Sequence, residues 1–138
     1  MAMACTFTRD ESIGVGGLPV RVYTYDWVSD VADGDVDDSV QTDLTRISGE
    51  ILRVVTIPGS PAPTNGYDVV LTDEDGYDVL AGQGANRSSS TVQSVAPGVP
   101  LSDGTTTSVG PMPVHSKLTL GVTNAGNSKA GKVKVYVR

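Results

Sequence analysis

The chain has 138 residues, a mass of 14.3 kDa, a net charge of −6 and a single cysteine. A chain of this length can bury one hydrophobic core without metal or disulfide support, and one cysteine excludes an intramolecular disulfide. The acidic balance disfavours a nucleic-acid partner, and no stretch approaches the ~18 apolar residues of a membrane span. The N-terminal "MAMACTFTRDE" lacks a basic start followed by an apolar run, so we expect a soluble protein made and folded in the cytoplasm of its producer.

The front of the chain predicts one strand and one tight turn. Residues 1–16 are compatible with an extended N-terminal segment. In "LPVRVYTYDWV" (18–28), two valines alternate with an arginine and two tyrosines, and this period of two predicts a strand. The Asp33-Gly34 pair that follows is typical of a two-residue β-hairpin loop.

The middle of the chain predicts a buried strand and two loops. "EILRVVTI" (50–57) is apolar on both sides of the alternation, which predicts a strand covered on both faces. "PGSPAPTNG" (58–66) contains three prolines and is expected to be a loop. Residues 82–116 are dominated by small, polar and turn-forming types, which predicts a long polar loop or arm that could still supply a short edge strand.

The end of the chain predicts two strands. Apolar residues alternate in "KLTLGVT" (117–123) and in "KVKVYVR" (132–138), and the second segment places its basic residues on the outer face. The intervening "NAGNSKAG" (124–131) tolerates positive φ, so the two segments are expected to form a C-terminal hairpin.

No window of the sequence predicts a helix, because Gly, Pro, Thr, Ser, Asp and Val are abundant and capped helical runs are missing. About seven or eight short strands separated by turns indicate an all-β fold. We therefore expect one domain over residues 1–138, an antiparallel β-sandwich or small barrel, with a jelly roll as one possible form.

The segment "YDVVLTDEDGYDVL" (67–80) raises the question of a metal site, since its acidic run 73–76 could bind a cation or could turn the chain round. For the turn, Asp73 would accept from the backbone two residues on, and Gly76 would take a left-handed conformation. Residues 67, 69 and 71 would then share one face, and the two YDV copies would pair across a hairpin.

Neither acidic region fits the EF-hand pattern. If Asp73 and Asp75 fill positions 3 and 5, Leu71 and Gly82 fall where the pattern needs Asp and Glu. A second alignment, with Asp33, Asp35 and Asp37 at positions 1, 3 and 5, puts Asp38 in place of the glycine and Leu44 in place of the final Glu. We therefore expect no metal ligands, while an irregular calcium site in the loops stays open.

The sequence offers few candidate catalytic residues. His115 is the only histidine and stands alone before a predicted strand, Cys5 has no motif around it, and "GVGG" and "GQGAN" lack the lysine of a phosphate loop. Trp27 and the five tyrosines show no spacing that marks a sugar-binding platform. We expect no enzyme activity, no catalytic residues and no cofactor.

Charge is divided unevenly along the chain. Residues 26–78 hold thirteen acidic side chains and two arginines, for a charge of −11, whereas residues 79–138 hold six basic side chains and one aspartate, for +5. Such asymmetry suits docking between copies or onto a charged lattice, although two solvated faces of one fold would show it as well.

The central and C-terminal blocks carry a resemblance. The first block, "RVVTIPGSPAPTNGYDVVLTDEDGYDVLAGQGANRSSS" (53–90), contains the pattern RVVTxPGxxxPTxxYDVxLTDxDGxDVLxG. The second block, "KLTLGVTNAGNSKAGKVKVYVR" (117–138), contains the pattern LTLxVxNAGxxxxGxVxVY. With these patterns the chain resembles, over about residues 49–138, small all-β proteins encoded among the structural genes of tailed bacteriophages and prophages.

The resemblance implies a virion structural protein, most naturally a head decoration or cement protein. Such a protein binds the outer surface of the expanded shell, commonly as a homotrimer, and stabilises contacts between major capsid proteins. Its expected location is therefore the head surface of a virion assembled in the host cytoplasm. Two alternatives remain open: a tail, connector or baseplate-associated β-domain, and a carbohydrate- or calcium-binding β-sandwich module.

Overall fold

The computed structural model describes residues 2–13, 19–102 and 109–138, and within them the fold is all-β. The main sheet is antiparallel and runs in the order β1-β2-β10-β3-β5, with β8 pairing with the first half of β3. Its strands are β1 (Ala4–Ile13), β2 (Pro19–Val28), β3 (Ile47–Pro58), β5 (Gln93–Val95), β8 (Met112–Ser116) and β10 (Ala130–Val137).

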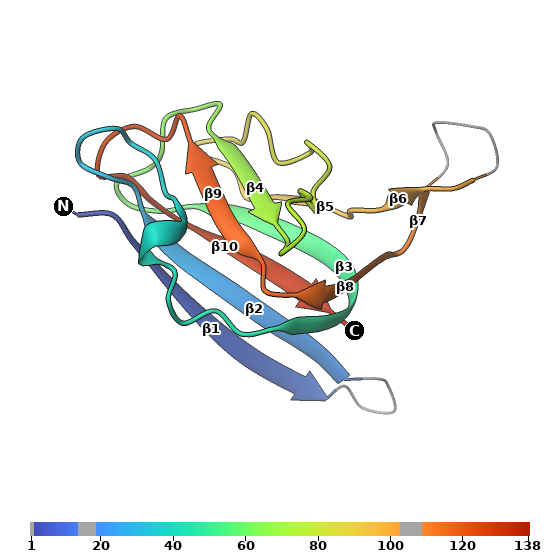
Figure 1. Cartoon of the computed structure of the whole chain (residues 1–138). Helices are drawn as coiled ribbons and strands as arrows, with labels where there is room; N and C mark the ends of the chain where they lie inside the picture. The colour runs from blue at the N-terminus through green and yellow to red at the C-terminus, as the bar shows by residue number, and fades with distance from the viewer. Residues whose placement is uncertain (1, 14–18, 103–108) are drawn as a thin grey trace.

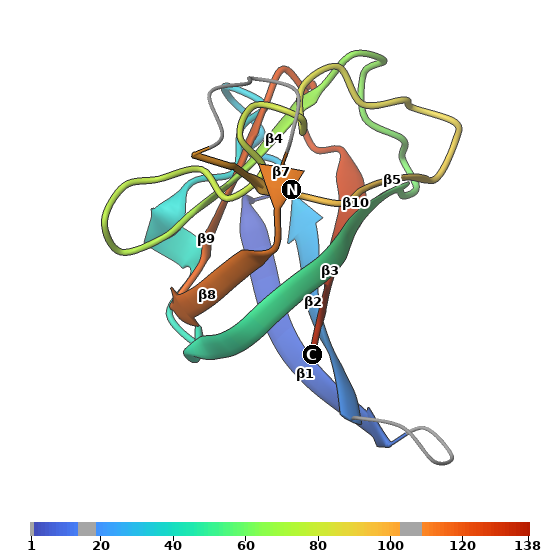
Figure 2. The ribbon, with the colours of Figure 1, turned by 90° about the vertical axis from the view of Figure 1, so that its right-hand side faces the viewer.

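The main sheet curls into a half-barrel, and a second sheet lies across its concave side (Figures 1 and 2). The second sheet consists of β4 (Asp68–Thr72) and β9 (Thr119–Thr123), which pair antiparallel. A short ribbon of β6 (Val99–Pro100) and β7 (Val109–Gly110) stands away from this body, and one 3₁₀ turn, η1 (Asp38–Val40), lies near β9.

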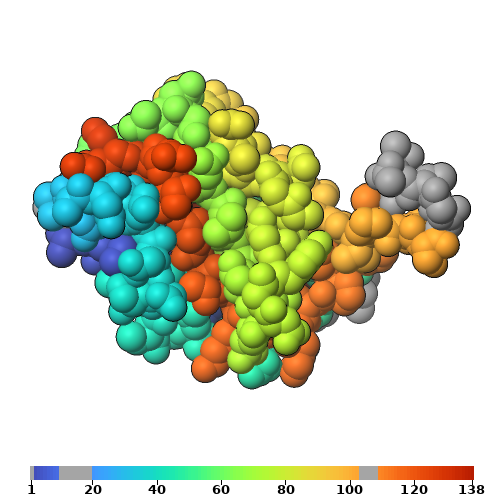
Figure 3. All heavy atoms as spheres, turned by 45° about the horizontal axis from the view of Figure 1, so that its top comes forward, coloured from blue at the N-terminus to red at the C-terminus, as the bar shows by residue number. Residues whose placement is uncertain are grey.

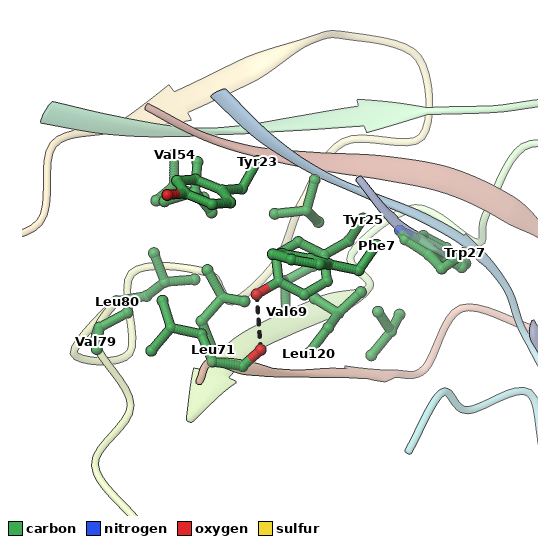
Figure 4. Close-up of a cluster of buried hydrophobic side chains, with 14 of the residues drawn as sticks. Phe7, Tyr23, Tyr25, Trp27, Val54, Val69, Leu71, Val79, Leu80 and Leu120 are labelled. Carbon is green, nitrogen blue, oxygen red and sulfur yellow. Dashed lines mark hydrogen bonds between the residues drawn. The ribbon is translucent and has the colours of Figure 1, made fainter. Parts of the chain in front are cut away.

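The core fills the space between the two sheets. The main sheet contributes Tyr23, Tyr25 and Trp27 from β2, and the second sheet contributes Val69 and Leu71 from β4 with partners from β9 (Figure 4). Burial of each large side chain stabilises the fold by roughly 1.5–3 kcal/mol. The Tyr25 hydroxyl, inside this core, donates to the Leu118 carbonyl at 2.7 Å, so its one polar group is satisfied.

The predicted all-β class is confirmed, and so are the strands predicted at 18–28, 117–123 and 132–138. Ten strands lie in the described ranges, more than the seven or eight expected, because the second half of the chain forms several very short ones. In β2 the aromatic side chains face the core, whereas Val20 and Val22 lie half-buried on the outer face. The larger tyrosine and tryptophan rings bury more apolar area than the valines.

The prediction of a C-terminal hairpin is wrong. β9 pairs with β4, whereas β10 lies between β2 and β3 in the main sheet, so residues 124–129 cross from one sheet to the other. Each strand has one apolar face, and the two faces lie on opposite sides of the same core. The alternation therefore correctly predicted that each strand buries one face, but it did not identify the strand with which each one pairs.

The Asp33-Gly34 hairpin is also wrong. Residues 30–35 form a turn in which the Gly34 amide donates to the Asp30 carbonyl at 3.1 Å, but no strand pair flanks it. After the turn, Val36 makes an isolated bridge to Val122 of β9, so the chain leaves β2 and joins the second sheet instead of returning.

The strand predicted at 50–57 is part of β3, and Val54, Val55 and Thr56 are all buried, which confirms cover on both faces at this point. The long loop predicted at 82–116 is only partly right. It includes the expected edge strand β5, but β8 adds to the main sheet beside β3.

The predicted extended N-terminal segment is strand over much of its length. Ala4–Ile13 forms β1, which pairs along its whole length with β2. Residues 1 and 14–16 of that segment, and the "GVGG" stretch at 14–17, lie outside the described residues.

Candidate functional site

The acidic run 73–76 forms a tight turn at the end of β4. One carboxylate oxygen of Asp73 accepts the amides of Asp75 at 3.0 Å and Tyr77 at 2.9 Å, and the Gly76 amide donates to the Asp73 carbonyl at 3.0 Å. Gly76 has φ +88°, the left-handed region that favours glycine. The roles predicted for Asp73 and Gly76 are therefore confirmed.

The two YDV copies do not pair as facing strands. Tyr67, Val69 and Leu71 do share a buried face, as predicted, but the ladder partner of β4 is β9. The returning chain makes one bridge, Thr72 to Asp78, and then turns away.

Beyond this bridge, the Asp78 carboxylate accepts hydrogen bonds from backbone amides where a strand ladder would otherwise continue. Its Oδ1 atom accepts the amides of Leu71 at 3.1 Å and Leu80 at 3.0 Å, and its Oδ2 atom accepts that of Gly82 at 3.0 Å. Side-chain bonding of this kind competes with a strand pairing, so the chain bends after Asp78. Val79 and Leu80 then enter the core.

Glu74 ties the turn to the segment between β8 and β9. Its carboxylate lies 2.6 Å from Nη1 of Arg46, and it accepts the Lys117 amide and the Ser116 hydroxyl at 3.3 Å. The Lys117 amide foremost, then Arg46, lowers the pKa of Glu74 below its usual value. Both charged side chains are about half exposed, so solvent screens the pair.

Aspartates of the second acidic region, residues 30–38, likewise accept hydrogen bonds from nearby backbone amides. Asp33 accepts the amide of Asp35 at 3.0 Å, and Asp37 caps η1 by accepting the Ser39 amide at 2.9 Å. The hydroxyl and amide of Ser39 lower the pKa of Asp37. In the part of the chain that the structure describes, no three His, Cys, Asp or Glu side chains are grouped so as to hold a metal ion.

The two lone reactive residues lie in different surroundings. Cys5 is buried beside Trp27 in the β1-β2 register, and burial, followed by the charges of Asp43 and Asp26, raises the pKa of its thiol to about 12. It therefore stays a protonated thiol near neutral pH. His115 is exposed on β8, with Nδ1 3.2 Å from the Ser48 hydroxyl of β3.

Most aromatic side chains belong to the core. Trp27 and three tyrosines are fully buried, at positions 23, 25 and 67. Of the remaining two, Tyr77 is 44% exposed and Tyr136 lies under the guanidinium of Arg53, whose Cζ is 4.4 Å from the ring centroid.

The structure shows two surface features, and the first of them was not located from the sequence. A groove of about 400 Å³ lies at the base of the β6-β7 ribbon, lined by residues that include Tyr77, Leu80, Pro97 and Val109. The ribbon itself projects from the body (Figure 3). The Pro- and Gly-rich stretch at 96–100 indicated a loop here, but nothing in the sequence showed that it stands out from the fold.

The second feature is the outer, convex face of the main sheet. The basic side chains of β10 point to this face, as the alternation in 132–138 predicted, and Arg53 of β3 joins them. That β3 is the neighbour of β10 could not be read from the alternation.

Comparison with protein-family models, with curated proteins and with solved structures finds no match. Among the described residues there is also no helix long and apolar enough to cross a membrane.

Proposed function

We propose that this chain is a structural protein of a tailed-bacteriophage virion, a decoration or cement protein that binds the outer surface of the head shell and stabilises contacts between major capsid proteins. The observation that carries the proposal is the shared pattern over residues 53–90 and 117–138. Its partners would be the major capsid protein and further copies of the chain, as a homotrimer.

The positions in that pattern have structural roles. The YDVxLTDxDG part forms β4 and its turn, and the LTLxVxNAG part forms β9 and the start of the crossover. In that crossover Asn124 and Gly126 both adopt positive φ, at +60° and +85°. The resemblance therefore concerns residues that build the second sheet. A fold of this kind supports the proposal because it holds surfaces in place for contacts with other proteins.

Copy number in the virion tests the proposal directly. Particles of the phage or prophage that encodes the chain would be purified, and the chain would be quantified against the major capsid protein by mass spectrometry. We expect a copy number of the same order as that of the capsid protein, because a decoration protein covers the whole shell. A few copies per particle would instead indicate a tail, connector or baseplate protein and would overturn the proposal.

Binding to empty heads provides a second readout. Purified protein should bind expanded heads that lack it and raise the temperature at which they disrupt, while unexpanded heads serve as the matched control. Binding should be unchanged by a calcium chelator or by added glycans. A requirement for calcium, or competition by a sugar, would favour the cation- or carbohydrate-binding module instead.

A further inference from the structure

The convex face of the main sheet, on the side away from the β4-β9 sheet, carries a basic and aromatic cluster around the buried Val55. Residues directly opposite each other in neighbouring antiparallel strands share a face, so the register places Lys134 beside Val55 and Tyr136 between Arg53 and Val22. The β4-β9 sheet lies on the concave side of the main sheet (Figure 2). These residues alternate with Val54 and Val135, which face the core, so their side chains lie on the opposite, convex face. We call this cluster the basic face; it consists of Val22, Arg53, Val55, Ile57, Lys134 and Tyr136.

The composition of the basic face is that of a protein contact surface. Arg53 stacks on Tyr136 at 4.4 Å, and arginine and tyrosine are enriched among residues that dominate binding energy. Ile57 and Val22 are half-buried beside them, and Val55 is buried between its neighbours. Lys134 thus lies on the central strand of the face, and the stacked Arg53 and Tyr136 lie beside it with apolar neighbours. The stacked pair is pre-ordered for a contact.

The cations of the basic face lack carboxylate partners. Lys132, at the other end of β10, lies 3.9 Å from Asp26, but within residues 2–13, 19–102 and 109–138 neither Lys134 nor Arg53 forms an ion pair. A surface with unpaired positive charge attracts a negatively charged partner and steers its approach.

The same chain carries the complementary surface. The loop Asp30–Asp38 contains five aspartates in nine residues and no basic side chain. The carboxylates of Asp35 and Asp38 make no hydrogen bond or ion pair with the described residues, so both remain free to bind a cation of another molecule. We call this segment the acidic loop.

The acidic loop begins at a distance from the two cations of the basic face in its own molecule. The loop begins beyond Val28, which pairs with Ala130, whereas Arg53 pairs with Tyr136 six residues further along β10. At about 3.3 Å per residue, Arg53 lies roughly 20 Å along the sheet from the start of the loop, and Lys134, four residues from Ala130, lies roughly 13 Å from it. Their charges can therefore compensate each other fully only between molecules.

We propose that copies of this chain associate head to tail, with the acidic loop of one copy seated on the basic face of the next. Because the contact joins two different surfaces, it is heterologous, and a closed ring such as a trimer satisfies every copy. The inference deepens the homotrimer of the proposed function by naming the two surfaces that meet, and it does not depend on the role in the virion, which the copy number tests separately.

The test measures the mass of the full chain in solution by sedimentation velocity over a range of concentrations. At about 50 mM salt we expect a closed oligomer, and at about 500 mM a dissociation constant at least roughly tenfold higher, because salt screens exposed charge pairs. A chain that stays monomeric at low salt, or an oligomer indifferent to salt, overturns the proposal.

Charge reversal identifies the surfaces. Lys134→Glu with Arg53→Glu should weaken association at least about tenfold, and so should Asp35→Lys with Asp38→Lys, because each change juxtaposes like charges. Combining all four substitutions in one chain reverses the charge of both surfaces, so opposite charges meet again and the oligomer should be restored. Lys117→Glu, an exposed charge change outside both surfaces, is the control and should leave association unchanged.

Circular dichroism of each variant establishes that it is folded before its mass is interpreted. Failure of the fourfold variant to associate, with its fold intact, would overturn the pairing of the acidic loop with the basic face. An oligomer lost equally in Lys117→Glu would also contradict it, since a general charge effect would then explain the result.

Discussion

At the scale of single residues, the acidic segment 73–78 is explained by hydrogen bonds to its own backbone. Asp78 accepts three amides, from Leu71, Leu80 and Gly82, whereas the Asp75 carboxylate accepts none among the described residues. Asp78→Ala should therefore lower the free energy of unfolding by about 1–3 kcal/mol, because amides in part-buried positions lose their acceptor. Urea denaturation of the purified chain measures this difference.

Asp75→Ala is the matched control, since it makes the same chemical change three residues away on an exposed side chain. We expect it to alter the free energy of unfolding by less than about 0.5 kcal/mol. Equal losses in the two variants would mean that the segment is stabilised by its charge as a whole, and the hydrogen-bonded turn would then not be the reason for the acidic residues.

At the scale of elements, one side chain joins the loop after η1 to the second sheet. Gln41 is buried; its amide nitrogen donates to the Leu120 carbonyl at 2.7 Å, and its amide oxygen accepts the Leu120 N–H at 2.8 Å. It thereby pairs like a single strand residue with Leu120 of β9, in addition to the bridge that Val36 makes to Val122 of the same strand. Gln41→Ala should cost about 1–3 kcal/mol, because two buried backbone groups lose their partners.

Hydrogen exchange at the Leu120 amide separates this role from a general loss of stability. Gln41→Ala should reduce its protection more than that of the Leu71 amide, while Thr42→Ala, an exposed neighbour, should change neither. In Gln41→Glu a buried carboxylate would face the Leu120 and Asp37 carbonyl oxygens, so a loss at least as large as in Gln41→Ala is expected. Unchanged protection of Leu120 in Gln41→Ala would contradict the role given to this side chain.

The elements also show how far the sequence can predict this fold. Period-two alternation predicted where β2, β9 and β10 lie, and the Asp73 and Gly76 turn followed from local chemistry. Strand partners were not predictable, because alternation specifies a buried face, and both β9 and β10 satisfy it on opposite sides of the core. Gln41 carried no signal, since a lone glutamine in a polar stretch has no pattern that marks it as buried.

At the scale of the whole molecule, neither sheet has a core of its own. The β4-β9 pair has only two strands, and such a sheet is marginal without a surface to pack against. The aromatic residues of β2 need the same contact, since Trp27 lies against Tyr67, with ring centroids 5.9 Å apart. Within the described residues the two sheets therefore depend on one shared interface, and the single domain over residues 1–138 stays a prediction.

We expect this shared core to unfold in one cooperative transition. Trp27 is the only tryptophan and is fully buried, so its fluorescence reports on the contact between the sheets, whereas far-ultraviolet circular dichroism reports on all the strands. In urea the two signals should follow one curve with a common midpoint, which is the test of two-state behaviour. A fluorescence midpoint at lower urea than the dichroism midpoint would mean that the β4-β9 sheet separates while the main sheet persists, and the chain would then contain two units of independent stability.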